Sequence, residues 1–100
     1  MSWQVRHHPL VELDILEAYT WYEYQKKDLG ERFAKEVQKK LASIQLIPES
    51  FGSRSNKTHR EVMVDDFPYL IIYRLNKKKK IIFISSIHHT KKHPRHKIRR

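Results

Sequence analysis

The sequence predicts an α+β domain in which a helical hairpin packs on an antiparallel sheet. In the first half, apolar residues recur every three or four positions in two adjoining segments, which is the period of amphipathic helices. The second half holds short β-branched and aromatic runs bounded by turn residues, as strands do. A chain of 100 residues can bury one modest core. The predicted order, β-α-α-β-β-β, keeps helices and strands apart, which is typical of this class.

The first strand and the first helix are expected within residues 2–26. Residues 2–7 alternate weakly between apolar and polar side chains, which indicates a short strand. Pro9 suits the start of a helix, because the first helical N–H has no intrahelical partner to lose. We expect this helix to bury an apolar stripe widened by Trp21 and Tyr22. The stripe comprises Leu10, Leu13, Leu16 or Glu17, Thr20 and Tyr24.

A second helix is expected after a break at residues 28–31. Asp28 can cap this helix, and Glu31 three residues later can close a capping box. Pro48 ends the helix near residue 47. The residues expected on its buried face are Phe33, Val37, Leu41 and Ile44.

Three further strands are expected at residues 60–64, 69–75 and 81–87. The run from Tyr69 to Leu75 is continuously apolar up to Arg74, which indicates a central strand covered on both faces. Residues 49–59 are expected to form a loop, and the lysine-rich residues 76–80 a hairpin turn. The domain is expected to span residues 1–94, followed by a basic and mobile tail at 95–100.

The charge is distributed unevenly along the chain. The formal net charge is +10, and all eleven acidic residues lie between Glu12 and Asp66. Residues 67–100 therefore carry eleven lysines and arginines with no acid at all. A long segment of one sign predicts a polyanionic partner or an acidic protein that covers it, the alternative being a solvated basic tail.

Composition excludes several classes of site. The chain has no cysteine, so a thiolate nucleophile, a disulfide framework and a zinc ribbon are impossible. Two glycines exclude a glycine-rich phosphate loop. The longest apolar runs are too short for a membrane span, and we expect a cytoplasmic protein without metal or other cofactor. The spacing His89-x3-His93 lacks a nearby carboxylate, so it indicates adventitious metal uptake.

Three stretches follow one another in an order that is typical of one protein family. The first holds Trp21-Tyr22-Glu23 and Asp28-Leu29-Gly30-Glu31-Arg32-Phe33, and the second runs from Ile44 to Pro48 and then Arg60. The third holds Phe67-Pro68-Tyr69-Leu70-Ile71-Ile72-Tyr73-Arg74 and the exit His89-Thr90-Lys91-Lys92-His93-Pro94. Over residues 5–94 they resemble the RelE/ParE toxins of bacterial type II toxin–antitoxin systems. Lys91 and Lys92 stand where arginines are usual, and His93 replaces a common acid.

The resemblance implies a RelE/ParE-like fold and a plasmid-stabilisation toxin that a cognate antitoxin neutralises. ParE-type members inhibit DNA gyrase, whereas RelE-type members cut messenger RNA, many of them on the ribosome. The strand from Phe67 to Tyr73 favours the ParE type. A basic RNA-binding module without a toxin role is the third alternative.

If the chain is a ribonuclease, it uses attack by a 2′-hydroxyl and needs no metal. Arg60 and Arg74 are then candidates to stabilise the phosphorane, with His88 or His89 as acid or base and His59 as a further candidate. His88 and His89 point to opposite faces if the strand continues to them, so at most one faces a site.

The candidate binding residues are expected to contact the nucleic-acid backbone or its bases. The set comprises Lys91, Lys92, His93 and Tyr73. Tyr69, Trp21 and Tyr22 can also stack bases, although we favour core packing for Trp21 and for alternate residues of the 69–75 strand.

Overall fold

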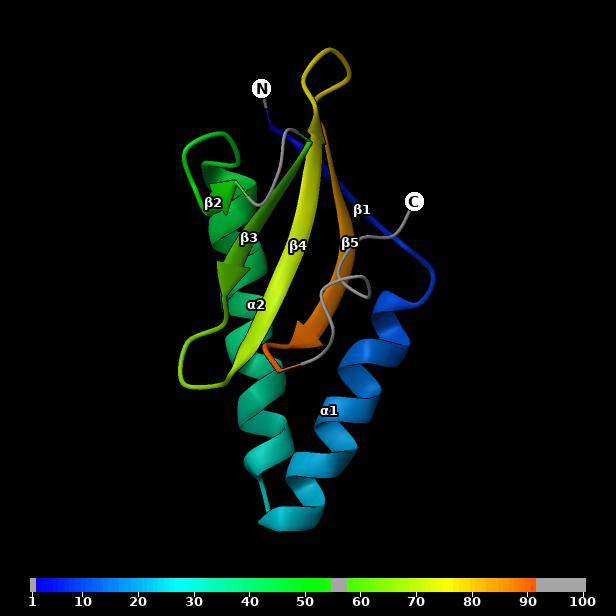
Figure 1. Cartoon of the computed structure of the whole chain (residues 1–100), viewed down its shortest axis with the longest axis vertical. Coiled ribbons are helices and arrows are strands. Elements are labelled where there is room, and N and C mark those ends of the chain that lie inside the picture. Colours follow the sequence, from blue (N-terminus) through cyan, green and yellow to red (C-terminus); the bar gives the residue numbers. More distant parts are fainter. Residues whose placement is uncertain (1, 55–57, 92–100) are drawn as a thin grey trace.

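The computed structural model describes residues 2–54 and 58–91 and places two helices against a five-stranded sheet (Figure 1). The predicted tail at residues 95–100 lies outside the described residues, as do Lys92 and His93. No helix in the described part of the chain is long and apolar enough to cross a membrane. The elements are β1 (Gln4–His7), α1 (Val11–Gln25), α2 (Leu29–Leu46), β2 (Ser53–Arg54), β3 (His59–Met63), β4 (Tyr69–Asn76) and β5 (Ile81–His89).

The α+β class and the order of the predicted elements are confirmed, but two details of the sheet differ. The strand order is β1-β5-β4-β3-β2, with β4 in the middle. β1 pairs with β5 in parallel, so the sheet is mixed where we expected an antiparallel one. Parallel pairing is possible because the helical hairpin carries the chain back along the sheet after β1. The sequence did not reveal it, because the alternation of side chains is the same in parallel and antiparallel strands. The two-residue strand β2 lies in the predicted loop.

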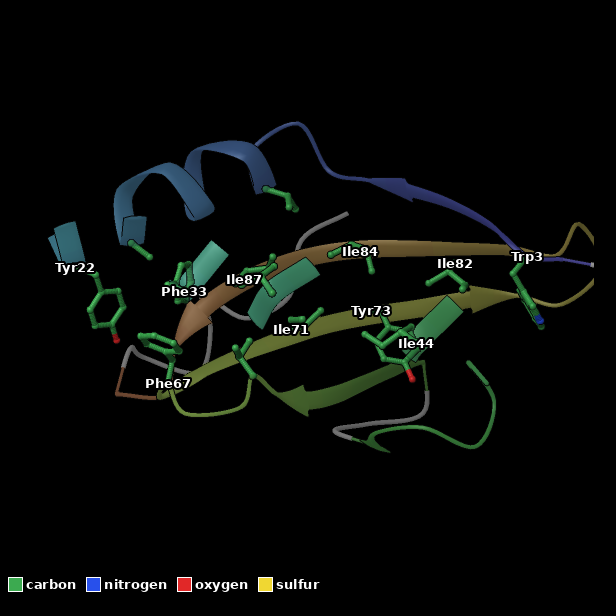
Figure 2. Close-up of a cluster of buried hydrophobic side chains, with 14 residues drawn as sticks. Trp3, Tyr22, Phe33, Ile44, Phe67, Ile71, Tyr73, Ile82, Ile84 and Ile87 are labelled. Carbon is green, nitrogen blue, oxygen red and sulfur yellow. The ribbon is translucent and has the colours of Figure 1, made fainter. Parts of the chain in front are cut away.

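The core lies between α2 and the helix-facing side of the sheet. Figure 2 shows Ile71 and Tyr73 of β4 gathered with Phe33 and Ile44 of α2. Phe33, Val37 and Ile44 are fully buried, which confirms the predicted face of α2. Leu41 packs against the core on the same face, as expected, but it is only partly buried.

A β-bulge keeps β5 in register with this core. Ile72 pairs with Ser86 but Tyr73 pairs with Ile84, so Ser85 is the extra residue. A bulge shifts the alternation of side chains by one position. Ile84 and Ile87 both face the core as a result, although they are three positions apart, an odd spacing that would place them on opposite faces of a regular strand.

The buried face of α1 differs from the predicted one except at Tyr22. Tyr22 is buried with Val11 and Ala18, and its ring lies 5.4 Å from that of Phe33 and 4.9 Å from that of Phe67. The expected stripe points to solvent instead; its exposed members include Leu10, Leu13, Leu16, Trp21 and Tyr24. The helix carries apolar residues on two opposite sides, and the larger ones lie on the outer side. Core packing of Trp21 is therefore also wrong.

The start of α2 is held by Glu23 and not by the predicted capping box. Asp28 has a φ of 70° and no side-chain capping bond. The two carboxylate oxygens of Glu23 accept hydrogen bonds from the backbone N–H groups of Asp28 at 2.9 Å and Gly30 at 3.0 Å. A Cβ at Gly30 would lie 2.5 Å from the backbone oxygen of Tyr19, so this close approach of the helices requires glycine.

Candidate functional site

The two candidate arginines lie on opposite faces of the sheet. Arg60 is the cross-strand partner of Tyr73, which faces the core, so Arg60 belongs to the helix-facing side. Arg74 follows Tyr73 and therefore lies on the outer face, which we define as the side of the sheet away from the helices. There it pairs with His59. A single phosphate cannot be held between these two arginines.

The two candidate histidines are also separated, as their adjacency predicts. Strand β5 continues to His89, so His88 and His89 point to opposite faces. His89 lies on the helix-facing side, where its ring is 5.2 Å from that of Tyr69 at 77°. His88 is 5% exposed.

Of these four candidates, Arg60 and His89 share the helix-facing side and Arg74 and His88 share the outer face, each pair at different ends of β4, while the further candidate His59 lies beside Arg74. On the helix-facing side, Arg60 lies beside Tyr73 and His89 beside Tyr69. Four residues of an antiparallel strand span about 13 Å, and the packed core fills the space between them. A general acid or base must reach its proton within about 3 Å. The four candidate catalytic residues therefore do not form one site.

Tyr73 is fully buried, and the structure gives this candidate binding residue no exposed surface. Its hydroxyl lies 3.1 Å from the backbone oxygen of Pro48 and also contacts that of Phe51. Burial raises the pKa of Tyr73, and the smaller, opposite effect of Arg60 does not cancel this. Tyr73 connects the middle strand to the segment after α2.

His59 lies on the outer face beside Arg74 and is 7% exposed. Burial lowers the pKa of His59, and the positive charge of Arg74 lowers it further. The ring is therefore neutral at neutral pH. Its Nδ1 lies 2.8 Å from the hydroxyl of Thr58.

A hollow of about 470 Å³ lies between α1 and the end of β5. We call it the α1–β5 hollow; its walls include Asp14, Glu17, Trp21, Tyr69, His89 and Lys91. The backbone N–H of Ile87 donates to the Asp14 carboxylate at 3.0 Å, which fixes α1 against β5. Burial, and secondarily the Tyr22 hydroxyl, Glu17 and Asp14, raise the pKa of Tyr69. The hollow offers carboxylates, a cation and aromatic walls to a partner's side chain.

This hollow brings together three candidate site residues, His88, His89 and Lys91, with the carboxylates of Asp14 and Glu17, which the sequence reasoning missed. Trp21 is 58% exposed at its rim. Trp21 lies at the flank of the buried side of α1, with its ring 5.1 Å from that of Tyr22, so it borders the hollow where we expected it in the core. Within residues 2–54 and 58–91, no three potential metal ligands gather.

Comparison with known families decides the identity. A sequence model described as the ParE toxin of the type II toxin–antitoxin system parDE matches residues 5–94. The chain belongs to the ParE toxin family. The predicted assignment as the toxin of a type II system is thereby confirmed.

Solved structures share the fold of this ParE-family toxin at low sequence identity. The chromosomal ParDE system of P. aeruginosa gives a TM-score of 0.78 at 13% identity, covering 89% of this chain and 97% of that one. The archaeal RelE–RelB complex from Pyrococcus horikoshii OT3 gives 0.64 at 14%, covering 93% and 100%. The intact E. coli RelBE complex gives 0.63 at 15%, covering 90% and 99%. A search of curated protein sequences found no significant match.

Proposed function

We propose that this ParE-family toxin inhibits DNA gyrase when free and is held inactive by a cognate antitoxin. The observation that carries the proposal is the family match over residues 5–94. ParE-type toxins, which the sequence resembles, are inhibitors of gyrase, and inhibition by binding needs no catalytic group in the toxin itself.

The geometry of the sheet supports a binding role over RNA cleavage. Arg60 and His89 are separated by the packed core, and Arg74 lies on the other face. A ribonuclease needs its proton donor, proton acceptor and cations around one phosphate. The described residues that we named as catalytic candidates do not provide this arrangement.

The charge and the α1–β5 hollow support an antitoxin partner. Residues 67–100 carry eleven lysines and arginines and no acidic residue, so an acidic segment is expected to bind there. Trp21 and Leu16 next to this region are exposed and offer apolar contacts. The structurally similar proteins from P. aeruginosa and E. coli belong to toxin–antitoxin systems. We expect the antitoxin to combine acids with spaced apolar anchors, and to bind as a helix in a groove or as an added strand.

Two assays on the purified toxin test the target. We expect inhibition of gyrase supercoiling on plasmid DNA, and no cleavage of messenger RNA with or without ribosomes. Cleavage by the wild type that His89→Ala and Arg60→Ala each abolish would establish the RelE-like alternative instead. Loss of a general acid or base slows a reaction by about 10²–10⁴-fold, so the two outcomes are clearly separated.

Co-purification with the product of the adjacent gene tests the partner. We expect a stable complex that the charge reversals Lys91→Glu and Lys92→Glu weaken together, most strongly at low salt. The matched control reverses Lys26 and Lys27, which follow α1 and do not line the α1–β5 hollow. Equal weakening by both pairs would show that the antitoxin responds to net charge alone and does not bind at Lys91.

A further inference from the structure

A row of side chains crosses the outer face of the sheet near the β4–β5 hairpin. Arg6 of β1 and Arg74 of β4 are both cross-strand partners of Phe83 of β5. Directly opposite residues share a face, and neighbouring strands lie about 4.8 Å apart. Phe83 therefore has an arginine on either side, with the two arginine backbones about 10 Å apart.

Arg74 is held in place by this arrangement. The centre of its guanidinium lies 4.3 Å from the centroid of the Phe83 ring. A guanidinium on an aromatic face keeps the N–H groups at its edge available as hydrogen-bond donors. The interaction restrains a side chain that otherwise has considerable rotamer freedom, so less entropy is lost when a ligand binds.

Lysines of the hairpin extend the row into a basic hollow. The hollow has a volume of about 510 Å³, and Arg6, Arg74, Lys77 and Lys78 contribute four cations to its lining. No acidic residue lines it. Among the lining cations, Lys77 forms an ion pair with an acid: its ammonium lies 3.8 Å from the Glu49 carboxylate, and both side chains are exposed. An ion pair at that distance and exposure is weak, so a stronger anion can replace it.

Three apolar residues, Leu75, Ile81 and Phe83, also line the hollow, and each is only partly exposed. The large exposed apolar side chains of the described residues lie on α1, at the end of α2 and at Met63, and none of them lines this hollow. The four cations are therefore the strongest interaction that the hollow offers a ligand. Phosphodiester groups match these cations, because arginine forks and lysine ammonium groups both bind phosphate oxygens.

We propose that this basic hollow binds the phosphodiester backbone of a nucleic acid, independently of base sequence. The site lies at the hairpin end of the sheet, whereas His89 and Lys91 lie at the opposite end of β5 (Figure 1). It is therefore distinct from the α1–β5 hollow, and the two ends of the toxin contact different partners. The proposal does not depend on inhibition of gyrase, because DNA alone is the ligand in its test.

The test measures the binding of fluorescein-labelled duplex DNA to the full-length toxin by fluorescence anisotropy over a series of NaCl concentrations. The variant Arg6→Gln with Lys78→Gln removes two lining cations from different elements. The control, Lys26→Gln with Lys27→Gln, removes the same charge at the α1–α2 connection, at the other end of the molecule (Figure 1). Thermal unfolding by circular dichroism checks that each variant is folded.

Removal of two phosphate contacts is expected to reduce the slope of log K against log salt by about 1.8 and to weaken binding by about 10- to 100-fold near 0.1 M salt. The control pair should change affinity by less than about threefold, because only distant, screened charge is lost. Arg74→Lys keeps the charge but removes the guanidinium stacked on Phe83, and we expect it to weaken binding as well.

Three results would overturn the proposal. One is the absence of DNA binding by the wild type at about 50 mM NaCl, where electrostatic binding is strong. Another is an equal loss in both double variants, which would mean that net charge alone attracts DNA. The third is displacement of DNA by poly-L-glutamate as efficiently as by unlabelled DNA, which would assign the hollow to an acidic protein. Repeating the titration with single-stranded RNA shows which nucleic acid binds more tightly. Weaker binding of both nucleic acids by the variant Arg6→Gln with Lys78→Gln supports the site.

Discussion

At the scale of single residues, Tyr73 and His59 illustrate how the middle of the sheet uses buried polar groups. Tyr73 faces the core and reaches the backbone oxygens of Pro48 and Phe51. His59 lies on the other face beside Arg74. Both side chains are nearly inaccessible to water. Tyr73 therefore affects stability through its buried hydrogen bonds, and His59 through its protonation state.

Tyr73→Phe is expected to lower the free energy of unfolding by about 1–3 kcal/mol, because it removes the donor from a buried acceptor without changing the ring. Urea unfolding measures the difference. Tyr69→Phe serves as a control on the same strand, since Tyr69 is only partly buried. A loss for Tyr73→Phe no larger than for Tyr69→Phe would mean that the bonds to the segment after α2 add nothing to stability.

The stability of the fold is expected to depend on the protonation of His59. Its pKa is lower in the folded protein than the ordinary value of 6.5. As pH falls below that value, the unfolded chain binds a proton that the folded protein does not, so the free energy of unfolding decreases until the folded-state pKa is passed. Urea unfolding at pH 7.5 and at pH 5.5 gives the decrease in the free energy of unfolding between the two pH values. This decrease should be smaller for His59→Gln than for the wild type. Equal losses would assign the effect to other groups.

At the scale of secondary structure, the two helices differ in how much of their packing the sequence reveals. α2 has a single apolar stripe, so its buried residues Phe33, Val37 and Ile44 were predicted correctly. α1 has two stripes, and the side with the larger residues is exposed. Which stripe meets the sheet depends on the angle at which Glu23 and Gly30 join the helices, and local sequence does not report that angle.

The difference between full and partial burial on α2 gives a quantitative prediction. Ile44→Ala should lower the free energy of unfolding by about 2–5 kcal/mol, because Ile44 is fully buried and leaves a cavity. Leu41→Ala should cost less, since Leu41 packs against the core from its edge and water can fill the space. Thermal or urea unfolding of both variants compares the two values. A larger loss for Leu41→Ala would place that residue in the core after all.

At the scale of the whole molecule, the strands were predictable individually but their arrangement was not. The apolar run from Tyr69 predicted β4 as the central strand, and it is the middle one. Arg60 and Arg74 were expected to act together because a ribonuclease needs cations around one phosphate. Strand register places them on opposite faces, and register depends on pairings between distant segments.

The folded unit is expected to be complete by residue 94. The buried cluster of Figure 2 extends from Trp3 to Ile87, and the family match ends at residue 94. A chain that stops after Pro94 should therefore unfold at the same urea concentration as the full chain. It should also bind DNA more weakly at low salt, because four cations are lost with residues 95–100. A fall in the urea midpoint of the shortened chain would place part of the fold in those six residues.

The pairing of the first strand with the last has a consequence for the cell that makes this toxin. Gln4 meets Ile81, and His7 meets Ile84, so β1 has no place in the sheet until β5 has been synthesised. Contacts between such distant segments carry a large loop-closure cost and form late in folding. A ribosome that stalls before residue 81 therefore releases a chain without its central pairings, which proteases can degrade. The toxin therefore acquires its shape only after β5 has been synthesised, and the cell is exposed to no folded toxin before that point.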